Sequence, residues 1–332
     1  MELKPLITII VPIYNTEQFL NHCIESIYLQ TYKNWECLLI DDCSTDNSAK
    51  IAKEWCNTDA RFKLLSTGTN SGVSRARNLA IRNANGDFVN FIDSDDWVGP
   101  TFLQDYLYHT PSKYKLVVQD LIKKFPNHIE ERTQGYRNET FNLPLELQKV
   151  ITDYKKTQGY VSNKLFNLLL IREKKLYFTD GVTNEDEIFF HNYLINVKEI
   201  VFLQTASYFY RQLPSSLSKR PQSEQFIRYL YHKKTFLDFI IKSDTVEKEY
   251  AIDYKNQKLS AILLHCLQLL WQSDENLNTK RILRKIYIIM RQNKLLQISF
   301  PKASSKNKIL LILLKFKIFK TASLFLTLKK SL

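Results

Sequence analysis

The fold is decided by the stretch from residue 6 to residue 15, LITIIVPIYN. Its first six residues are largely apolar and rich in β-branched side chains, as expected for a strand buried on both faces of a parallel sheet. A turn from Pro12 to Asn15 follows, and Thr16 is a candidate cap for a helix that extends to about Leu29. A strand followed directly by a helix is the unit from which parallel sheets are built.

Strands and helices keep alternating over residues 36–92. Strands are predicted at 36–40, 61–65 and 87–92, and helices at 46–56 and 73–84. The β-α-β-α-β-α-β order with short connections favours an α/β fold with a mostly parallel central sheet and helices on both faces. Ligands of such sheets bind at the carboxyl ends of the strands, so we expect functional residues just after each strand.

The chain beyond residue 100 is less regular. Its predicted elements are a strand at 116–122, helices at 161–171 and 185–193, and an extended segment at 200–210. Beyond Arg220 the periodicity is helical, most clearly over residues 259–271, which predicts an α-helical C-terminal region. We therefore divide the chain into a nucleotide-binding domain, residues 1–218, and a helical region with a basic, apolar tail, residues 219–332.

The positive charge of the chain is concentrated near its C-terminus. The chain has 332 residues and a net charge of +13, but residues 276–332 hold 14 Lys or Arg and no carboxylate. The first 275 residues hold 33 basic and 34 acidic residues, so the main body is close to neutral. This distribution argues against nucleic acid as a partner.

The tail from Lys308 to Leu328 alternates apolar runs with Lys315, Lys317 and Lys320. Three lysines within one span argue against a transmembrane helix, whereas a segment at the membrane interface, attracted to anionic lipid, fits better. A basic helix that packs on its own domain or on a partner is the alternative. Five cysteines without CxxC spacing and an N-terminus without a signal-peptide pattern favour the cytoplasm. We expect a cytoplasmic protein that is peripheral on the inner face of the cell membrane.

An acidic cluster follows the predicted strand at 87–92. Asp93 and Asp95 are spaced i, i+2, which in extended backbone points both side chains the same way. Two carboxylates at a strand end form an oxygen-ligand site for Mg²⁺ or Mn²⁺, ions that also bridge diphosphate oxygens. An isolated pair of this kind is more often a solvated turn, but here Asp96 and Trp97 follow, and a large aromatic beside charges is unusual in a plain turn.

Two further groups of polar residues follow predicted strands. Asp41 and Asp42 precede residues that cap the next helix, and capping does not explain the doubled aspartate. One of the two is therefore available to accept a hydrogen bond from a ligand such as a pyrimidine imide. Arg75 and Arg77 oppose the dipole of the helix that they open, which a nearby diphosphate or nucleobase would offset. Surface arginines are the alternative, more reasonable for Arg75 than for Arg77.

Together these segments resemble, in order and spacing, the GT-A domain of inverting family-2 glycosyltransferases of the bacterial surface-polysaccharide type. The matching segments are VPIYN (11–15), DDCSTD (41–46), GVSRARN (72–78), GD (86–87), DSDDW (93–97), NKLF (163–166), EDE (185–187) with Phe189, and Tyr210-Arg211 with Ser216. Cys43 departs from the family, which usually has glycine there. A residue other than glycine disfavours positive φ but removes no ligand.

The resemblance implies a role for each matching residue. Tyr14 would pack on the nucleobase, Asp42 would bind its imide edge, and Arg77 would contact the base or the diphosphate. Asp95 would be the principal ligand of Mn²⁺ or Mg²⁺, and Asp93 would serve the metal and the ribose. Asp186 would be the general base. The remaining residues implied in nucleotide binding are Pro12, Ser94, Arg211 and Ser216, the last two in a segment that closes over the diphosphate.

The function implied is transfer of a hexosyl or N-acetylhexosaminyl group, with UDP-sugar as the favoured donor and a hydroxyl of a glycan or lipid-linked glycan as the acceptor. Metal-assisted direct displacement would invert the anomeric carbon. Two alternatives remain. A sugar-nucleotide pyrophosphorylase would need a Gly-rich phosphate loop after the first strand, where the chain has Pro12 to Asn15. A membrane-associated scaffold without turnover would not need Asp93, Asp95 and Asp186.

Overall fold

The computed structural model describes residues 4–109, 111–125, 131–132, 138–143, 146, 150, 159–182, 184–212 and 279–292. The chain divides into two compact units, Met1–Pro214 and Ser215–Leu332. The predicted boundary between residues 218 and 219 lies outside the described residues, as do the helical segment at 259–271 and the tail at 308–328, so these stay predictions.

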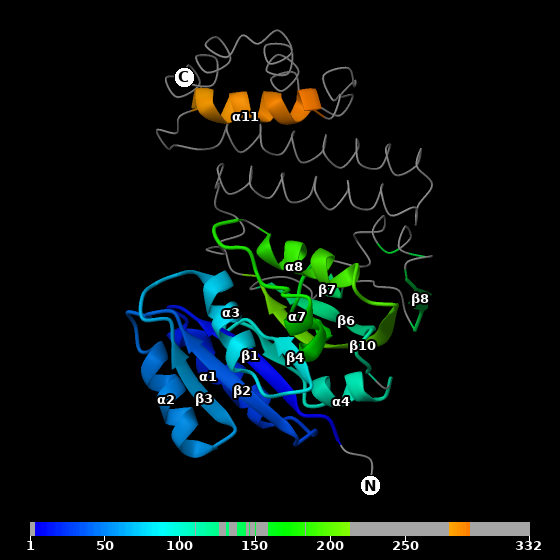
Figure 1. Cartoon of the computed structure of the whole chain (residues 1–332). Coiled ribbons are helices and arrows are strands. Elements are labelled where there is room, and N and C mark those ends of the chain that lie inside the picture. The colour runs from blue at the N-terminus through cyan, green and yellow to red at the C-terminus, as the bar shows by residue number, and fades with distance from the viewer. Residues whose placement is uncertain are drawn as a thin grey trace. The chain divides into compact units, whose positions relative to one another are not determined.

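The centre of the first unit is a sheet whose described part has ten strands (Figure 1). The strands are β1 (Ile7–Ile13), β2 (Trp35–Asp41), β3 (Phe62–Ser66), β4 (Phe88–Phe91), β5 (Trp97–Val98), β6 (Lys115–Lys124), β7 (Glu131–Arg132), β8 (Thr140–Asn142), β9 (Lys164–Asn167) and β10 (Glu199–Arg211). Their order is β3-β2-β1-β4-β9-β6-β10-β5, with β7 beside β6 and β8 beside β10.

The strands from β3 to β4 are parallel, as the alternation predicts. Beyond β4 the sheet is mixed: β9 is antiparallel to both β4 and β6, whereas β10 runs parallel to β6. The α/β fold class is thus confirmed. Because β6 and β10 run in the same direction as β4, their carboxyl ends lie at the same edge of the sheet as those of the parallel half.

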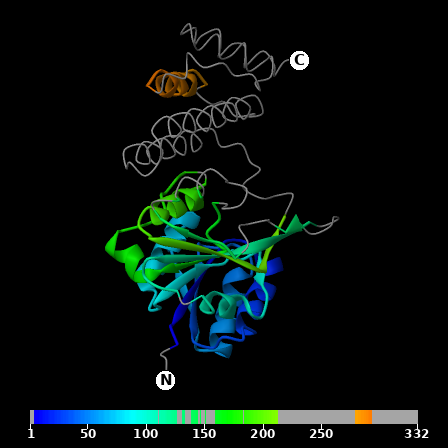
Figure 2. The ribbon, with the colours of Figure 1, turned by 90° about the vertical axis from the view of Figure 1, so that its right-hand side faces the viewer.

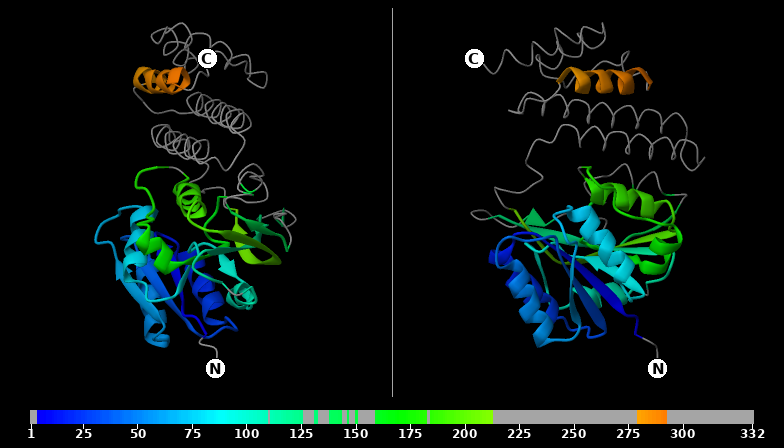
Figure 3. Two further views of the ribbon diagram at one scale, coloured as in Figure 1. Left: turned by 45° about the vertical axis from the view of Figure 1, so that its right-hand side comes forward. Right: turned by 60° about the vertical axis from the view of Figure 1, so that its left-hand side comes forward.

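Helices cover both faces of the sheet. They are α1 (Glu17–Tyr28), α2 (Ser48–Thr58), α3 (Val73–Asn83), α4 (Phe102–Leu107), α7 (Leu168–Glu173) and α8 (Glu185–Leu194), with α11 (Thr279–Gln292) in the second unit. Figures 2 and 3 show α3, α7 and α8 on one face and α1, α2 and α4 on the other. Within the described residues no helix is long and apolar enough to cross a membrane.

The core consists of the apolar strand residues and the helix faces packed on them. Every residue of β2 and β4 is buried, which explains why apolar residues predominate in both strands. Each fully buried Ile, Leu or Phe contributes roughly 1.5–3 kcal/mol by leaving water. Glu36 is one of two buried acidic residues in β2, with Asp41, and its carboxylate accepts hydrogen bonds from Thr8, Lys63 and Asn85.

The predicted helix at 161–171 is wrong in its first half. Residues 164–167 form β9 between β4 and β6, and α7 begins only at Leu168. Asn167 separates the two, because its Oδ1 accepts the N–H of Leu170 at 2.9 Å and so caps α7.

The start of α1 is also capped differently from the prediction. Thr16 makes no side-chain hydrogen bond to α1. Asp46 accepts the N–H of Glu17 at 3.1 Å instead, and the N–H of Ser48 in α2 at 2.9 Å, so one carboxylate caps two helices.

Candidate active site

The loops that follow β1 and β2 meet at the carboxyl edge of the parallel strands. The last residues of the two strands are paired, Ile13 with Asp41. Asn15 joins the loops, because its N–H donates to Ser44 Oγ at 3.2 Å and its Oδ1 accepts from the N–H of Thr45 at 2.8 Å. Residues that the sequence separates by about thirty positions therefore form one surface at this edge.

The acidic loop after β4 lies beside these two. Thr16 donates to Ser94 Oγ at 3.1 Å, which ties the start of α1 to this loop, where Ser94 is buried. The Asp93 side chain is 37% exposed, and Asp95 is partly buried. Burial and the charge of Asp93 raise the pKa of Asp95 to about 6, so this loop has an excess of negative charge.

A buried network holds the acidic loop against β10. Asp96 accepts a hydrogen bond of 2.6 Å from the Tyr208 hydroxyl and one of 2.8 Å from the Arg211 N–H. The Tyr208 hydroxyl also accepts the N–H of Asp93 at 3.3 Å. Burial, and then the charges of Asp95 and Asp93, raise the pKa of Asp96 well above its ordinary value. Asp96 and Tyr208 thus position the carboxylates beside them.

Arg211 contacts the acidic loop, and its predicted contact with a diphosphate stays a prediction. Its Nε donates to the carbonyl oxygen of Asp95 at 2.8 Å, and its guanidinium carbon lies 4.6 Å from the centre of the Trp97 ring. The ring of Phe19 lies 4.8 Å from the same carbon. A cation held between two rings beside the carboxylates has the charge needed to contact a diphosphate. Ser216 lies outside the described residues.

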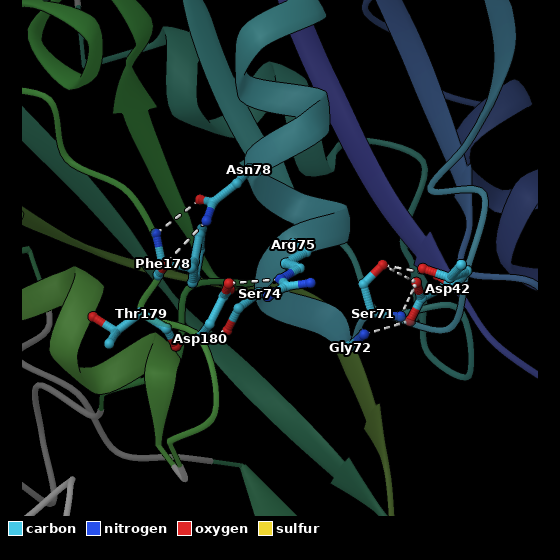
Figure 4. Close-up of polar contacts among 10 residues, drawn as sticks. Asp42, Ser71, Gly72, Ser74, Arg75, Asn78, Phe178, Thr179 and Asp180 are labelled. Carbon is cyan, nitrogen blue, oxygen red and sulfur yellow. Dashed lines mark hydrogen bonds and ion pairs between the residues drawn. The ribbon is translucent and has the colours of Figure 1, made fainter.

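The Asp42 carboxylate is engaged by the segment that leads into α3 (Figure 4). One oxygen accepts from the Thr67 hydroxyl at 2.7 Å and from the Ser71 N–H at 2.9 Å. The other accepts the N–H of Gly72 at 2.7 Å. Asp42 is buried and fixes the start of α3, a structural function that the sequence did not reveal. Its predicted contact with a nucleobase stays a prediction.

Pro12 lies at the end of β1 and Tyr14 just after it. The Tyr14 side chain is 44% exposed at the end of β1, so its ring is accessible to a ligand. Pro12 is the partly exposed residue of β1 and pairs with Ile40. Both stay predicted contacts of a nucleotide.

Arg77 connects the acidic loop to the start of α8. Its side chain is 5% exposed, and one terminal nitrogen donates to Asp93 Oδ1 at 2.8 Å while the other donates to Glu185 Oε1 at 3.0 Å. Burial alone would lower the pKa of this guanidinium, but Asp93, Glu185 and Asp186 outweigh it and raise the pKa. Asp93 of the predicted metal site and Glu185, the neighbour of the predicted base, therefore meet at one buried cation.

Asp186 lies in the first turn of α8, and its Oδ1 accepts the N–H of Glu187 at 2.8 Å. Burial, and next the charge of Glu185, raise its pKa from 3.8 to about 7, with Arg77 opposing. A carboxyl with such a pKa exchanges its proton readily near neutral pH, as a general base requires.

A buried lysine near Asp186 was not recognised from the sequence. Lys164 donates to the Tyr160 carbonyl oxygen at 2.5 Å and to Asn163 Oδ1 at 2.9 Å. Burial lowers its pKa to about 7, although Asp186 opposes that shift. The NKLF match at 163–166 pointed to this position without giving it a function.

The residues of the acidic loop fit a divalent cation that is shared with a phosphate-bearing ligand. Among the described residues no group of three or more His, Cys, Asp or Glu side chains is placed to hold a metal ion by itself. Mg²⁺ is usually held by one or two carboxylates together with substrate phosphates, and Asp93 and Asp95 provide two. The raised pKa of Asp95 indicates that a cation would be favourable here.

Comparisons with known proteins identify the class. The family model described as "Glycosyl transferase family 2" matches residues 8–171. An uncharacterised glycosyltransferase of Haemophilus influenzae is 34% identical over 209 residues, which cover 62% of this chain and 79% of that protein. Glycosyltransferase GlyG of Streptococcus pneumoniae is 29% identical over 233 residues, 65% of this chain and 74% of that one. The protein is a glycosyltransferase.

A solved structure shows the same fold. The crystal structure of Staphylococcus aureus TarS 1–349 in complex with UDP-GlcNAc has a TM-score of 0.69 and 20% identity, and covers 98% of this chain and 90% of that chain. The GT-A fold predicted from the sequence is thereby confirmed. The chain belongs to glycosyltransferase family 2.

Proposed function

We propose that the chain transfers a sugar from a UDP-sugar to a hydroxyl of a glycan or lipid-linked glycan, with inversion at the anomeric carbon. The observation that carries the proposal is the link from Asp93 through Arg77 to Glu185, which joins the carboxylates after β4 to the turn that holds Asp186. Because TarS was crystallised with UDP-GlcNAc, this donor is the first to test. N-acetylhexosaminyl or hexosyl transfer follows from that choice.

Each part of the site has one task in this reaction. Tyr14, Pro12 and Asp42 bind the nucleoside, and Arg211 and Ser216 hold the diphosphate. When bound at Asp95 and Asp93, a divalent cation such as Mn²⁺ or Mg²⁺ supplies positive charge for the leaving diphosphate. Ser94 keeps the acidic loop against α1.

Asp186 removes the proton of the acceptor hydroxyl in this scheme. The hydroxyl oxygen attacks the anomeric carbon from the face opposite the nucleotide, and the bond from that carbon to the diphosphate breaks with its electron pair on the leaving UDP. A direct displacement needs a base on the acceptor side, and the pKa of Asp186, raised to about 7, supports that assignment. We further propose that this takes place at the cytoplasmic face of a membrane, with the basic tail as the contact.

A panel of nucleotide sugars tests the proposal. Thermal unfolding is followed with Mn²⁺ and each donor, for the wild type and for Asp95→Ala. A donor that stabilises only the wild type identifies the substrate class, because a ligand stabilises the folded state to which it binds. Release of UDP with an acceptor present then measures transfer. If no donor stabilises the wild type and none is turned over, the proposal is wrong.

A further inference from the structure

Arg77 is placed between two carboxylates and not towards solvent. Its side chain is 5% exposed, and its two terminal nitrogens are used on Asp93 and Glu185. The ring of Phe178 lies 5.1 Å from its guanidinium carbon. Its Nε is buried without a hydrogen-bond partner in the part of the chain that the structure describes. Both terminal nitrogens are therefore committed within the protein.

We propose that Arg77 is a positioning residue that joins Asp93 to the first turn of α8, and that it acts on sugar transfer and not on nucleotide affinity. The inference rests on the proposed function, because it assigns Asp93 to the donor side and Asp186 to the acceptor side. It replaces the nucleotide contact that the family resemblance implies for Arg77.

The chemistry of arginine suits this task. A guanidinium presents its donors in a rigid, planar arrangement, so it can hold two carboxylates in fixed directions at once. A lysine ammonium at the same place is a single point charge on a flexible chain and cannot hold both at the same geometry. Because Asp93 binds through Oδ1, its Oδ2 is left for the donor side. Because Glu185 precedes Asp186, holding its carboxylate holds the turn that carries the base.

The helix that bears Arg77 is itself fixed on two sides (Figure 4). At its N-terminus, Asp42 accepts the N–H of Gly72. Along its side, the Asn78 amide exchanges two hydrogen bonds of 2.8 Å with the backbone of Phe178, and Ser74 donates to the Thr179 carbonyl oxygen at 3.0 Å. The segment that contains Phe178 and Thr179 leads into α8. Helix α3 therefore contacts both the loop after β2 and the segment before α8.

The geometry predicts how replacing Arg77 would change the rate of sugar transfer and the affinity for UDP. Without the link, the acidic loop and the start of α8 are still held by their other contacts, but the spacing between them is no longer set. A displacement of about 1 Å in a reacting group lowers the rate roughly 100-fold. The nucleoside is assigned to the loops after β1 and β2, and the diphosphate to Arg211, Ser216 and a cation held mainly by Asp95. The polar contacts of Arg77 go instead to Asp93 and Glu185. The rate of transfer should fall while the affinity for UDP is kept.

The test compares Arg77→Met with Arg75→Met in the full-length chain. Arg75 lies two residues away on the same helix, where it is exposed and pairs with Asp180 at 2.7 Å, so it is a matched control outside the site. Affinity for UDP with Mn²⁺ is measured by titration calorimetry, and kcat by release of UDP at saturating donor and a fixed alkaline pH. We expect Arg77→Met to lower kcat about 100-fold with the Kd for UDP nearly unchanged, and Arg75→Met to change neither.

Glu185→Met removes the other end of the same link and serves if Arg77→Met does not fold. If the two residues act as one connection, the double variant loses about as much kcat as either single variant, because coupled effects do not add. A Kd for UDP that rises about tenfold or more in Arg77→Met at unchanged kcat overturns the inference, as do fully additive losses. If the wild type neither binds UDP nor releases it, both the inference and the proposed function are wrong. If the wild type is active and Arg77→Met has the same kcat and the same Kd for UDP, only the inference is wrong.

Discussion

Replacing Asp186 by Asn removes the ionisable group of the proposed base and keeps its size. The folded chain holds the Asp186 proton up to a pKa of about 7, whereas the ordinary value is 3.8. Because the folded-state pKa is raised, the protonated carboxyl contributes stability at low pH, and this contribution is lost as the pH rises towards 7. At about 1.4 kcal/mol per pKa unit the loss between about pH 5 and pH 8 has an upper limit of roughly 3 kcal/mol. The side chain retains some contact with solvent, so screening reduces the expected loss to about 1–2 kcal/mol.

An asparagine at this position does not titrate, so Asp186→Asn should gain stability relative to the wild type by that amount between about pH 5 and pH 8. Urea unfolding of both proteins at both pH values measures the gain. Glu25→Gln, an exposed carboxylate on α1, is the control and should show no such change. The variant should bind UDP as the wild type does but lose about 10²- to 10⁴-fold in transfer. Equal pH dependence in variant and wild type would refute the electrostatic reasoning, and transfer close to the wild-type rate would refute the base.

Three further outcomes are expected. Asp95→Asn should lose the stabilisation by UDP that depends on Mn²⁺. In the wild type, the affinity for Mn²⁺ measured by calorimetry should weaken as the pH falls through 6, because protons compete for the Asp95 carboxyl, whose pKa is about 6. Tyr208→Phe should lower the free energy of unfolding by about 1–3 kcal/mol, since Asp96 loses a buried donor; an unchanged urea midpoint would contradict this. Asn78→Ala should lower the free energy of unfolding by about 2 kcal/mol, because the N–H and C=O of Phe178 both lose their hydrogen-bond partner. A loss below about 0.5 kcal/mol in urea unfolding would contradict this explanation.

The parallel half of the sheet was predictable because its strands are short apolar runs between clear turns. The strand expected at 36–40 is Trp35–Asp41, and the one expected at 87–92 is Phe88–Phe91. Both are buried on two faces, so local hydrophobicity and tertiary position agree. The same agreement places the acidic loop directly after β4, which is why the candidate metal ligands could be read from the sequence.

Residues 161–171 show the limit of predicting secondary structure from local sequence. A short apolar run is compatible with a helix or a buried strand, and periodicity alone does not separate them. Pairing of residues 164–167 with β4 and β6 decides for a strand, and these partners lie far away in the chain. Only the cap at Asn167 was a local sign that the helix begins later.

The loop after β2 shows the opposite case, where a local rule is broken. Cys43 adopts a φ of 60°, although a residue other than glycine disfavours this region. Asp41 accepts the N–H of Ser44 at 3.1 Å, and the neighbouring Asn15 fixes the same loop, so its tertiary contacts outweigh the strain. Cys43 therefore holds a positive φ without being glycine.

The contacts of Arg77 could not be predicted from any local pattern. The conflict between an arginine and the start of a helix indicated that a negative partner was needed, but the partners are Asp93 and Glu185, the latter 108 positions away. Carboxylates gather at this edge of the sheet: Asp93, Asp95, Asp96, Glu185 and Asp186. Three of them, Asp95, Asp96 and Asp186, have a raised pKa, first because of burial and next because of a neighbouring carboxylate. In the proposed function, a divalent cation held by Asp93 and Asp95 would add positive charge to this cluster.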